Sequence, residues 1–387
     1  MNAPPSNPRP RIPPASLPPA IRRRLWWRAR EHDARNVLLR LLRVFFSGRT
    51  PAASGDASPR RLLLVRTGRT LGDMTMVLSL AAGCRRLFPD IRIAAVMRET
   101  LAPFFAGAPD LDAIHVLPRR ALVSPRATVR LFRALRAGWD AAIACDPPGK
   151  SSMTALALCL VARAGRRIGF ANEESRAFLT DAVSAPSDEP MRASLLRLTA
   201  PLKPETRISF SPPLPRVVPD SAALAAAENL LGRGAPATVI FVSKHWSKGW
   251  PLAAWLRVAS CLTDAGHRIR LAFGPGDDRA ADPAVAAWVE KSGGRGAVLL
   301  AQAPAVLIAT LAKCRLFLSN DCGPYHLAVA AGARCVGVFS TDEARRDFGY
   351  EAPGRFVAIH ASDPLTAEAR VVETARALLE NEKNPAA

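Results

Sequence analysis

The sequence predicts an α/β protein of two tandem Rossmann-like domains, whose parallel sheets face a cleft, preceded by a basic N-terminal extension. Three observations predict it. The chain has 387 residues, enough for two domains that each bury a core. From residue 60 onward, short apolar runs alternate with helical patterns, as in parallel sheets covered on both faces. A proline-rich segment at 209–220 interrupts this alternation once.

We therefore expect an extension at 1–59 and domains at 60–215 and 216–387. The first 20 residues hold eight prolines and are expected to form no regular structure. At 21–47 a narrow polar stripe runs along an apolar helical pattern, with Trp26 and Trp27 following three arginines. This segment is predicted to be either an interfacial helix on an anionic membrane or a helix packed on the protein's own surface. Small residues at 48–59 form a linker.

In the first domain, each predicted strand is a short apolar run bounded by turn residues: 62–65, 91–97, 113–117, 140–145 and 167–170. Between these strands, helices are predicted at 74–88, near 100, at 125–137 and at 151–164. The second domain starts with a helix at 221 and repeats the scheme, with strands at 238–242, 267–273, 297–300, 315–318 and 334–339. Its further helices are predicted at 251–265, 280–291, 304–312 and 324–331. Ligands of such sheets bind at the carboxyl ends of the strands.

The net charge of +20 favours anionic partners: nucleic acid, phospholipid head groups or phosphorylated substrates. Residues 1–50 alone carry eleven arginines against two acids. Aromatic residues make up only 6% of the chain, and no motif that reads RNA or DNA is present, which argues against nucleic acid.

Seven cysteines without a C-x-x-C pair or zinc-finger spacing indicate neither a disulfide framework nor structural zinc, and suit reduced cytosolic thiols. The sequence contains no run of about 20 apolar residues, so it predicts no transmembrane helix. The N-terminus also lacks a compact signal peptide. We therefore expect a cytoplasmic protein.

Three loops at predicted strand ends carry candidate chemistry. The first, 66–73, reads R-T-G-R-T-L-G-D; Gly72 permits a tight turn, and Asp73 is expected at the N-cap of the next helix. An Asp at that position is either a catalytic carboxylate or only a cap. The second loop, 243–251, places Lys244 and Lys248 where they can bind an anionic phosphate.

The third loop, 319–328, reads S-N-D-C-G-P-Y-H-L-A and opens a helix through a glycine-bearing turn. Backbone N–H groups at such a helix start form an anion site, which suits a diphosphate, with His326 as a further donor. By contrast, the segment 149–151 only mimics a P-loop, because Ala144 stands where that motif needs glycine. At 274–278 we expect a strand-to-helix loop with Asp277 and Asp278 on the ribose side of a nucleotide.

Together the three loops resemble the bacterial ADP-heptose:lipopolysaccharide heptosyltransferases, glycosyltransferase family 9, over roughly residues 60–350. The R-x-x-x-x-G-D motif corresponds to 66–73, which has one more residue between Arg66 and Gly72 than the motif. K-x-W-P is matched at 248–251 and D-[ST]-G-P-x-H-L-A corresponds to 321–328. The resemblance implies a GT-B fold with no bound metal. It also implies that Asp73 is the general base, and that Lys248 stabilises charge on the departing diphosphate. The donor would be held by a further set: Asp321, Cys322, Gly323 and His326.

Some positions depart from the family pattern. Cys322 replaces the usual hydroxyl residue, 339–343 reads F-S-T-D-E instead of F-G-P-T-D, and the second loop lacks an H-P-G opening. We expect an inverting transfer of heptose from ADP-heptose to a lipopolysaccharide core acceptor at the cytoplasmic face of a membrane. The alternatives are another nucleotide sugar or acceptor on the same fold, a basic nucleic-acid-binding protein, and a glycan-binding protein without catalysis.

Overall fold

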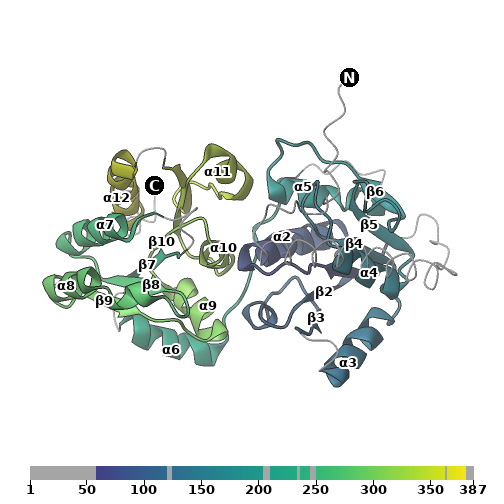
Figure 1. Ribbon diagram of the computed structural model, residues 1–387, viewed down its shortest axis with the longest axis horizontal. Helices are drawn as coiled ribbons and strands as arrows, with labels where there is room; N and C mark the ends of the chain where they lie inside the picture. The colour runs from purple at the N-terminus through teal and green to yellow at the C-terminus, as the bar shows by residue number, and fades with distance from the viewer. Residues whose placement is uncertain are drawn as a thin grey trace, which may run out of the picture.

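The computed structural model describes residues 58–119, 124–203, 210–232, 236–244, 250–361 and 364–380. The helix predicted at 21–47 and Lys248 lie outside these residues. The described chain forms two lobes, each built on a parallel sheet, as the sequence predicts (Figure 1). Each sheet has six strands, one more than predicted. We call the part with strands β1–β6 the first lobe and the part with β7–β12 the second lobe.

The first sheet has the strand order β3-β2-β1-β4-β5-β6. Its strands are β1 (Arg61–Val65), β2 (Arg92–Arg98), β3 (Ala113–Leu117), β4 (Ala141–Ala144), β5 (Arg166–Phe170) and β6 (Asp181–Val183). The side chains of β1 alternate between two apolar clusters: Leu62 and Leu64 face one, while Leu63 and Val65 face the other. Both faces are therefore covered, which explains why β1 reads as a continuous apolar run.

The helices of the first lobe divide between these two faces. On one face lie α2 (Leu71–Leu87), the 3₁₀ turn η1 (Ala102–Phe104) and α5 (Met191–Arg197). On the other lie α3 (Pro125–Leu135) and α4 (Met153–Ala162). A second 3₁₀ turn, η3 (Ala200–Leu202), follows α5.

The second sheet has the order β12-β11-β10-β7-β8-β9. Its strands are β7 (Thr238–Val242), β8 (Ile269–Phe273), β9 (Gly296–Leu299), β10 (Phe317–Asn320), β11 (Cys335–Phe339) and β12 (Phe356–His360). In each sheet the strand order reverses direction next to the first strand of the lobe, at β1 and at β7. Such a reversal opens a crevice at the carboxyl ends of the strands.

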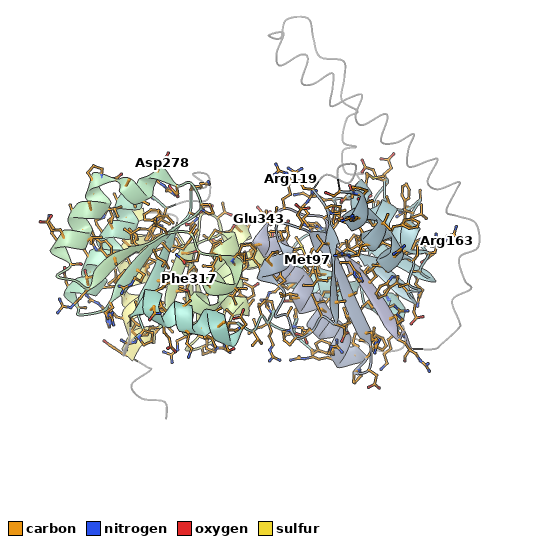
Figure 2. The ribbon with its side chains drawn as sticks, turned by 90° about the horizontal axis from the view of Figure 1, so that it is seen from below. Met97, Arg119, Arg163, Asp278, Phe317 and Glu343 are labelled. Carbon is orange, nitrogen blue, oxygen red and sulfur yellow. The ribbon has the colours of Figure 1, made fainter. Side chains whose placement is uncertain are left out.

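The helices of the second lobe also lie on both faces of their sheet. One face packs against α7 (Leu252–Asp264), α8 (Pro283–Lys291) and α12 (Pro364–Glu380). Toward the other face lie α6 (Ser221–Leu231), α9 (Pro304–Lys313) and α10 (Gly323–Ala330). The short η4 (Asp278–Ala281) and α11 (Asp342–Phe348) complete the lobe. Figure 2 shows Phe317 of β10 inside this lobe and Asp278 at its margin.

The two lobes share one apolar cluster, in which α2 of the first lobe packs against α10 of the second. The connecting segment is bonded to both lobes. Val217 N–H donates to Ala330 O at 2.8 Å, and Val218 N–H donates to Gly107 O at 2.8 Å. The carboxyl edges of the two sheets are thereby held next to each other.

No helix in the described ranges is long and apolar enough to cross a bilayer. Likewise, the described residues contain no group of three or more His, Cys, Asp and Glu side chains placed to hold a metal ion.

Candidate functional site

A cavity of about 890 Å³ lies where the carboxyl edges of the two lobes meet. The first lobe lines it with the loop between β1 and α2, the loop between β4 and α4, and residues of α5. From the second lobe, the start of α10 and Phe348 complete the wall. The first and third loops that the sequence singles out are therefore opposite sides of one cavity.

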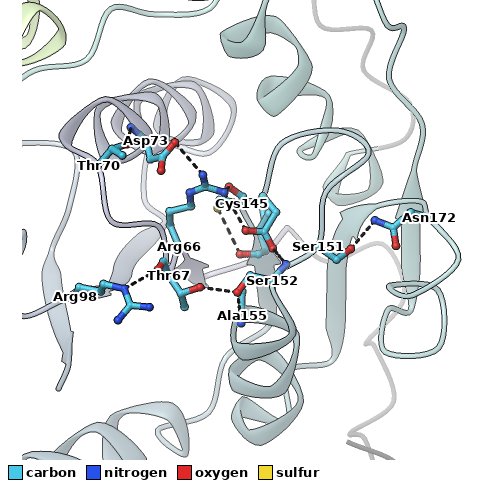
Figure 3. Close-up of polar contacts among 12 residues, drawn as sticks. Arg66, Thr67, Thr70, Asp73, Arg98, Cys145, Ser151, Ser152, Ala155 and Asn172 are labelled. Atoms are coloured by element: carbon cyan, nitrogen blue, oxygen red, sulfur yellow. Dashed lines mark hydrogen bonds and ion pairs between the residues drawn. The ribbon is translucent and has the colours of Figure 1, made fainter. Parts of the chain in front are cut away.

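Arg66, the first residue after β1, connects two carboxylates at the cavity wall. Its Nη2 lies 2.9 Å from Asp73 Oδ1 (Figure 3). Its Nη1 lies 2.9 Å from Asp146 Oδ1. Nη1 also donates to Cys145 O at 3.1 Å. Only 9% of the Arg66 side chain is exposed, so both ion pairs are shielded from solvent on the arginine side.

Asp73 does not cap α2, so the prediction that it is the N-cap is wrong. The N-cap is Thr70, whose Oγ1 accepts a hydrogen bond from Asp73 N–H at 3.2 Å. A threonine hydroxyl three residues before this N–H can cap the helix as well as an Asp can, and the helix starts three residues earlier than predicted. The Asp73 carboxylate is thereby left for Arg66 and the cavity, with 32% of its side chain exposed.

Asp146 is a site residue that no pattern in the sequence singles out. It follows β4, which pairs directly with β1, and its Oδ2 accepts from Ser152 N–H at 2.7 Å. Burial raises the pKa of the Asp146 carboxyl, while the Ser152 N–H and Arg66 oppose that rise. The one available signal is its position, because an acid after the strand next to β1 lies at the same sheet edge as Arg66.

The first lobe also supplies cations that are not paired with these carboxylates. Arg69, Arg98 and Lys150 line the cavity. The Arg98 guanidinium donates to Thr67 O at 2.8 Å; burial and then the charge of Arg69 lower its pKa. The segment that only mimics a P-loop therefore does face the cavity, through Lys150 and Ser151.

In the second lobe, Asp321, Cys322, Gly323 and His326 reach the same cavity. His326 Nε2 lies 3.5 Å from Asp321 Oδ1, and both side chains are almost fully buried. His326 Nδ1 has no hydrogen-bond partner within the described part of the chain. Cys322 is the N-cap of α10, but its side chain forms no capping hydrogen bond, and its Sγ lies 3.1 Å from Ser319 Oγ.

Two glycines bring the two lobes into contact at the cavity. A Cβ on Gly72 would lie 2.8 Å from Cδ2 of His326, and a Cβ on Gly323 would lie 2.9 Å from Cβ of Leu71. Real Cβ atoms do not come this close to other heavy atoms, so each position requires glycine for the observed approach. Gly72, predicted as a turn residue, thus also serves as a contact with His326.

The other predicted residues lie elsewhere at the carboxyl edge of the second sheet and do not line the cavity. Lys244 is exposed, and its Nζ donates to Pro275 O at 3.3 Å. Asp277 caps η4 and forms a two-point ion pair with Arg279, with Nη2 at 2.6 Å from Oδ2 and Nε at 2.9 Å from Oδ1. The Arg279 hydrogen bond lowers the pKa of Asp277. Asp278 is exposed to solvent (Figure 2).

The comparisons with known proteins agree with this architecture. The family model described as glycosyltransferase family 9 (heptosyltransferase) matches residues 128–360. No curated protein matches the sequence.

Solved structures share the fold at low sequence identity. A family 9 glycosyl transferase from Veillonella parvula has a TM-score of 0.69 at 19% identity, covering 83% of this chain and 98% of its own. The E. coli ADP-heptose lps heptosyltransferase II has a TM-score of 0.66 at 18% identity, covering 84% of this chain and 99% of its own. The E. coli heptosyltransferase WaaC with ADP has a TM-score of 0.62 at 19% identity, covering 81% of this chain and 99% of its own.

Proposed function

Because the chain belongs to glycosyltransferase family 9, the heptosyltransferases, we propose that it transfers heptose from ADP-heptose to a lipopolysaccharide core acceptor. The transfer inverts the anomeric centre and uses no metal. One observation carries this proposal: Arg66 holds the Asp73 carboxylate at 2.9 Å, and this carboxylate faces the same cavity as the start of α10.

In this proposal Asp73 is the general base. Its carboxylate accepts the proton of an acceptor hydroxyl while that oxygen attacks the anomeric carbon and the nucleoside diphosphate leaves from the opposite face. Arg66 and Asp146 are positioning residues, since they act through Asp73. They fix the carboxylate at the cavity wall, which reduces the cost of orienting the base.

The donor diphosphate binds at the N-terminus of α10. The Cys322 side chain forms no capping hydrogen bond there, and backbone N–H groups at a helix start stabilise a bound anion. His326 adds a donor, and Lys244 and Lys248 add positive charge toward the departing diphosphate. Asp277 and Asp278 lie on the ribose side; Asp277 is engaged by Arg279, so Asp278 is the more available acceptor for a ribose hydroxyl.

The acceptor binds in the first lobe. Arg69, Arg98 and Lys150 line that side of the cavity, and burial and the charge of Arg69 lower the pKa of Arg98. An acceptor saccharide with anionic groups offsets this charge. The basic segment at 21–47, outside the described residues, then holds the enzyme at the anionic inner face of the cytoplasmic membrane.

The test is to incubate the protein with ADP-heptose and a heptose-deficient lipopolysaccharide core, and to follow product mass. We expect the wild type to add one heptose in the presence of EDTA. Asp73→Asn should lower the rate by about 10² to 10⁴ fold, with ADP affinity measured by calorimetry unchanged. The exposed Asp90, between α2 and β2 and outside the cavity, offers a matched control, and Asp90→Asn should retain the wild-type rate.

The two parts of the proposal fail separately. If the wild type binds ADP but adds no heptose, the assigned donor sugar or acceptor is wrong. If Asp73→Asn adds heptose as fast as the wild type, Asp73 is not the base.

Cys322 favours one specific alternative, a different nucleotide sugar on the same fold, because the thiol changes the cap of the helix that holds the diphosphate. Calorimetry with ADP, UDP and GDP separates the two. Binding of ADP alone supports ADP-heptose, whereas tighter binding of UDP or GDP supports the alternative.

A further inference from the structure

The helix α3 lies at the outer margin of the first lobe and belongs to a stretch of the chain without negative charge (Figure 1). There is no Asp or Glu between Asp112 and Asp140. The same stretch has six arginines, and the four on α3 or at its C-cap are all exposed: Arg126, Arg130, Arg133 and Arg136. The stretch is therefore a strongly cationic surface at the periphery of the lobe.

Two large apolar side chains of α3 also point away from the core. Val129 and Phe132 are each 48% exposed. The inward face of the helix is already formed by Leu131 and Leu135, which are 7% and 2% exposed and belong to the cluster between α3, α4 and the sheet. Val129 and Phe132 therefore add little to the core, and a purely solvated helix face needs neither of them.

The arginines of this face are not neutralised by the protein. Among the described residues, Arg126, Arg130 and Arg133 take part in no ion pair and no side-chain hydrogen bond. The Arg136 guanidinium lies over the Phe132 ring, 5.9 Å from its centroid, which keeps cation and aromatic ring on one surface. The positive charge of the face is therefore free to meet an anion from outside.

We propose that this surface binds an anionic phospholipid bilayer. We name it the α3 face and define it by Arg126, Val129, Arg130, Phe132, Arg133 and Arg136. The arginines contact lipid phosphates, while Phe132 and Val129 enter the boundary between head groups and acyl chains. Nucleic acid shares the phosphate chemistry, but it would use the arginines alone and gives no role to two exposed apolar side chains.

The geometry relates this surface to the cavity. Because α3 connects the end of β3 to the start of β4, its first turn lies toward the carboxyl edge of the first sheet, where the cavity opens. It belongs to the same lobe as Arg69, Arg98 and Lys150. A bilayer bound by the α3 face therefore contacts the lobe in which we place the acceptor. Binding of lipid itself requires no transferase activity.

The test uses the full chain and sedimentation with phosphatidylcholine vesicles, with or without phosphatidylglycerol. We expect binding only to the vesicles that contain phosphatidylglycerol. R130Q/R133Q should lower the partition coefficient by about 10-fold or more, and V129S/F132S by about 5-fold or more. Both variants change exposed side chains, so their thermal unfolding should match the wild type.

Matched controls separate the α3 face from positive charge and exposed apolar side chains elsewhere on the protein. K291Q/R295Q removes the same charge from exposed positions of the second lobe, and Leu300→Ser removes an exposed apolar side chain. Neither control should change vesicle binding. The proposal fails if the α3 variants bind vesicles as the wild type does, or if K291Q/R295Q weakens binding as much as R130Q/R133Q.

One further result would assign the surface to nucleic acid and overturn the proposal. It is a loss of duplex DNA binding at physiological salt in R130Q/R133Q, with vesicle binding of V129S/F132S unchanged. Because vesicle binding is measured without donor or acceptor sugar, its outcome is independent of the proposed transfer reaction.

Discussion

Two of the helices that begin at the cavity, α2 and α10, start in opposite ways. At the start of α2, the Thr70 hydroxyl accepts from the backbone, and Asp73 places a negative charge in the first turn. At the start of α10, Cys322 gives no side-chain cap, and the first turn has no acid. A helix N-terminus attracts negative charge. In the first lobe the protein satisfies that attraction with its own carboxylate, whereas in the second lobe no carboxylate of the first turn does so, as our proposed donor site requires.

This difference separates two tasks. The carboxylate of α2 is held by Arg66, so it stays at a fixed place and is suited to accept a proton. The first turn of α10 has no acid, and the nearby Asp321 carboxylate faces His326, so the N–H groups of that turn are suited to bind an anion and release it. Substitutions at the two helix starts should therefore affect different steps, and the following three are ordered by the size of their expected effect.

Arg66→Met should have the largest effect, because it removes the cation shared by Asp73 and Asp146. We expect transfer to fall by about 100-fold, since the base loses its fixed position. The free energy of unfolding should fall by about 3 kcal/mol, because a buried carboxylate loses its ion-pair partner. Product mass and thermal unfolding measure the two effects. A variant with wild-type rate and stability would show that Arg66 does not position Asp73.

The same variant has a pH signature. Burial already raises the pKa of Asp146, and Arg66 opposes that rise, so the pKa should increase further without Arg66. The folded variant then holds a proton that the unfolded chain has lost, and its stability falls as pH rises from the ordinary Asp range through the raised pKa. The deficit relative to the wild type should be larger at about pH 8 than at about pH 5. Adding Asp146→Asn should remove this pH dependence.

Gly72→Ala should have an intermediate effect, because it pushes the two helix starts apart. The new Cβ would meet Cδ2 of His326 at 2.8 Å. We expect ADP affinity and transfer both to fall by about 10-fold, which corresponds to moderate overpacking. Calorimetry and product mass measure this. An unchanged ADP affinity would show that the second lobe binds its ligand independently of the α2 contact.

Cys322→Ser should have the smallest effect and the opposite sign. A hydroxyl at the cap of α10 can donate to a phosphate, so we expect ADP to bind about 3-fold more tightly. The matched substitution at α2 is Thr70→Ala, which should cost about 1 kcal/mol of stability through loss of the cap and leave ADP affinity unchanged. Weaker ADP binding by Cys322→Ser would show that the Cys322 contact with Ser319 is needed to shape the turn.

The sequence predicts most strands and helices because both sheets are buried on two faces, so each strand is an apolar run between amphipathic helices. The predicted bounds of β3 and β7 agree with the structure. No prediction covers β6 and α5, nor α11, β12 and α12 at the end of the second lobe. The strand β6 has three half-exposed or exposed residues, and α5 has seven residues, so neither carries enough of a period to be recognised.

The candidate site likewise has parts that the sequence predicts and a part that it does not. Local motifs identify Asp73 and the start of α10, because each lies in a short loop between a strand and a helix. The partner of Arg66 at Asp146 is 80 residues away and becomes its neighbour only through the pairing of β1 with β4. No local motif joins two such residues, and only the position of Asp146 after β4 points to the same sheet edge. The wrong N-cap at α2 has a local cause, since Thr70 and Asp73 are both good capping residues.

The contact of Gly72 with His326 also limits how this protein can change. The two residues come from different lobes and are 254 positions apart in the chain, yet the space for one side chain is set by the other. Substitutions that enlarge residue 72 are tolerated only with a smaller residue at 326, so the two positions are expected to vary together in evolution. Redesign of the nucleotide side for a new donor therefore has to include the first turn of a helix in the opposite lobe.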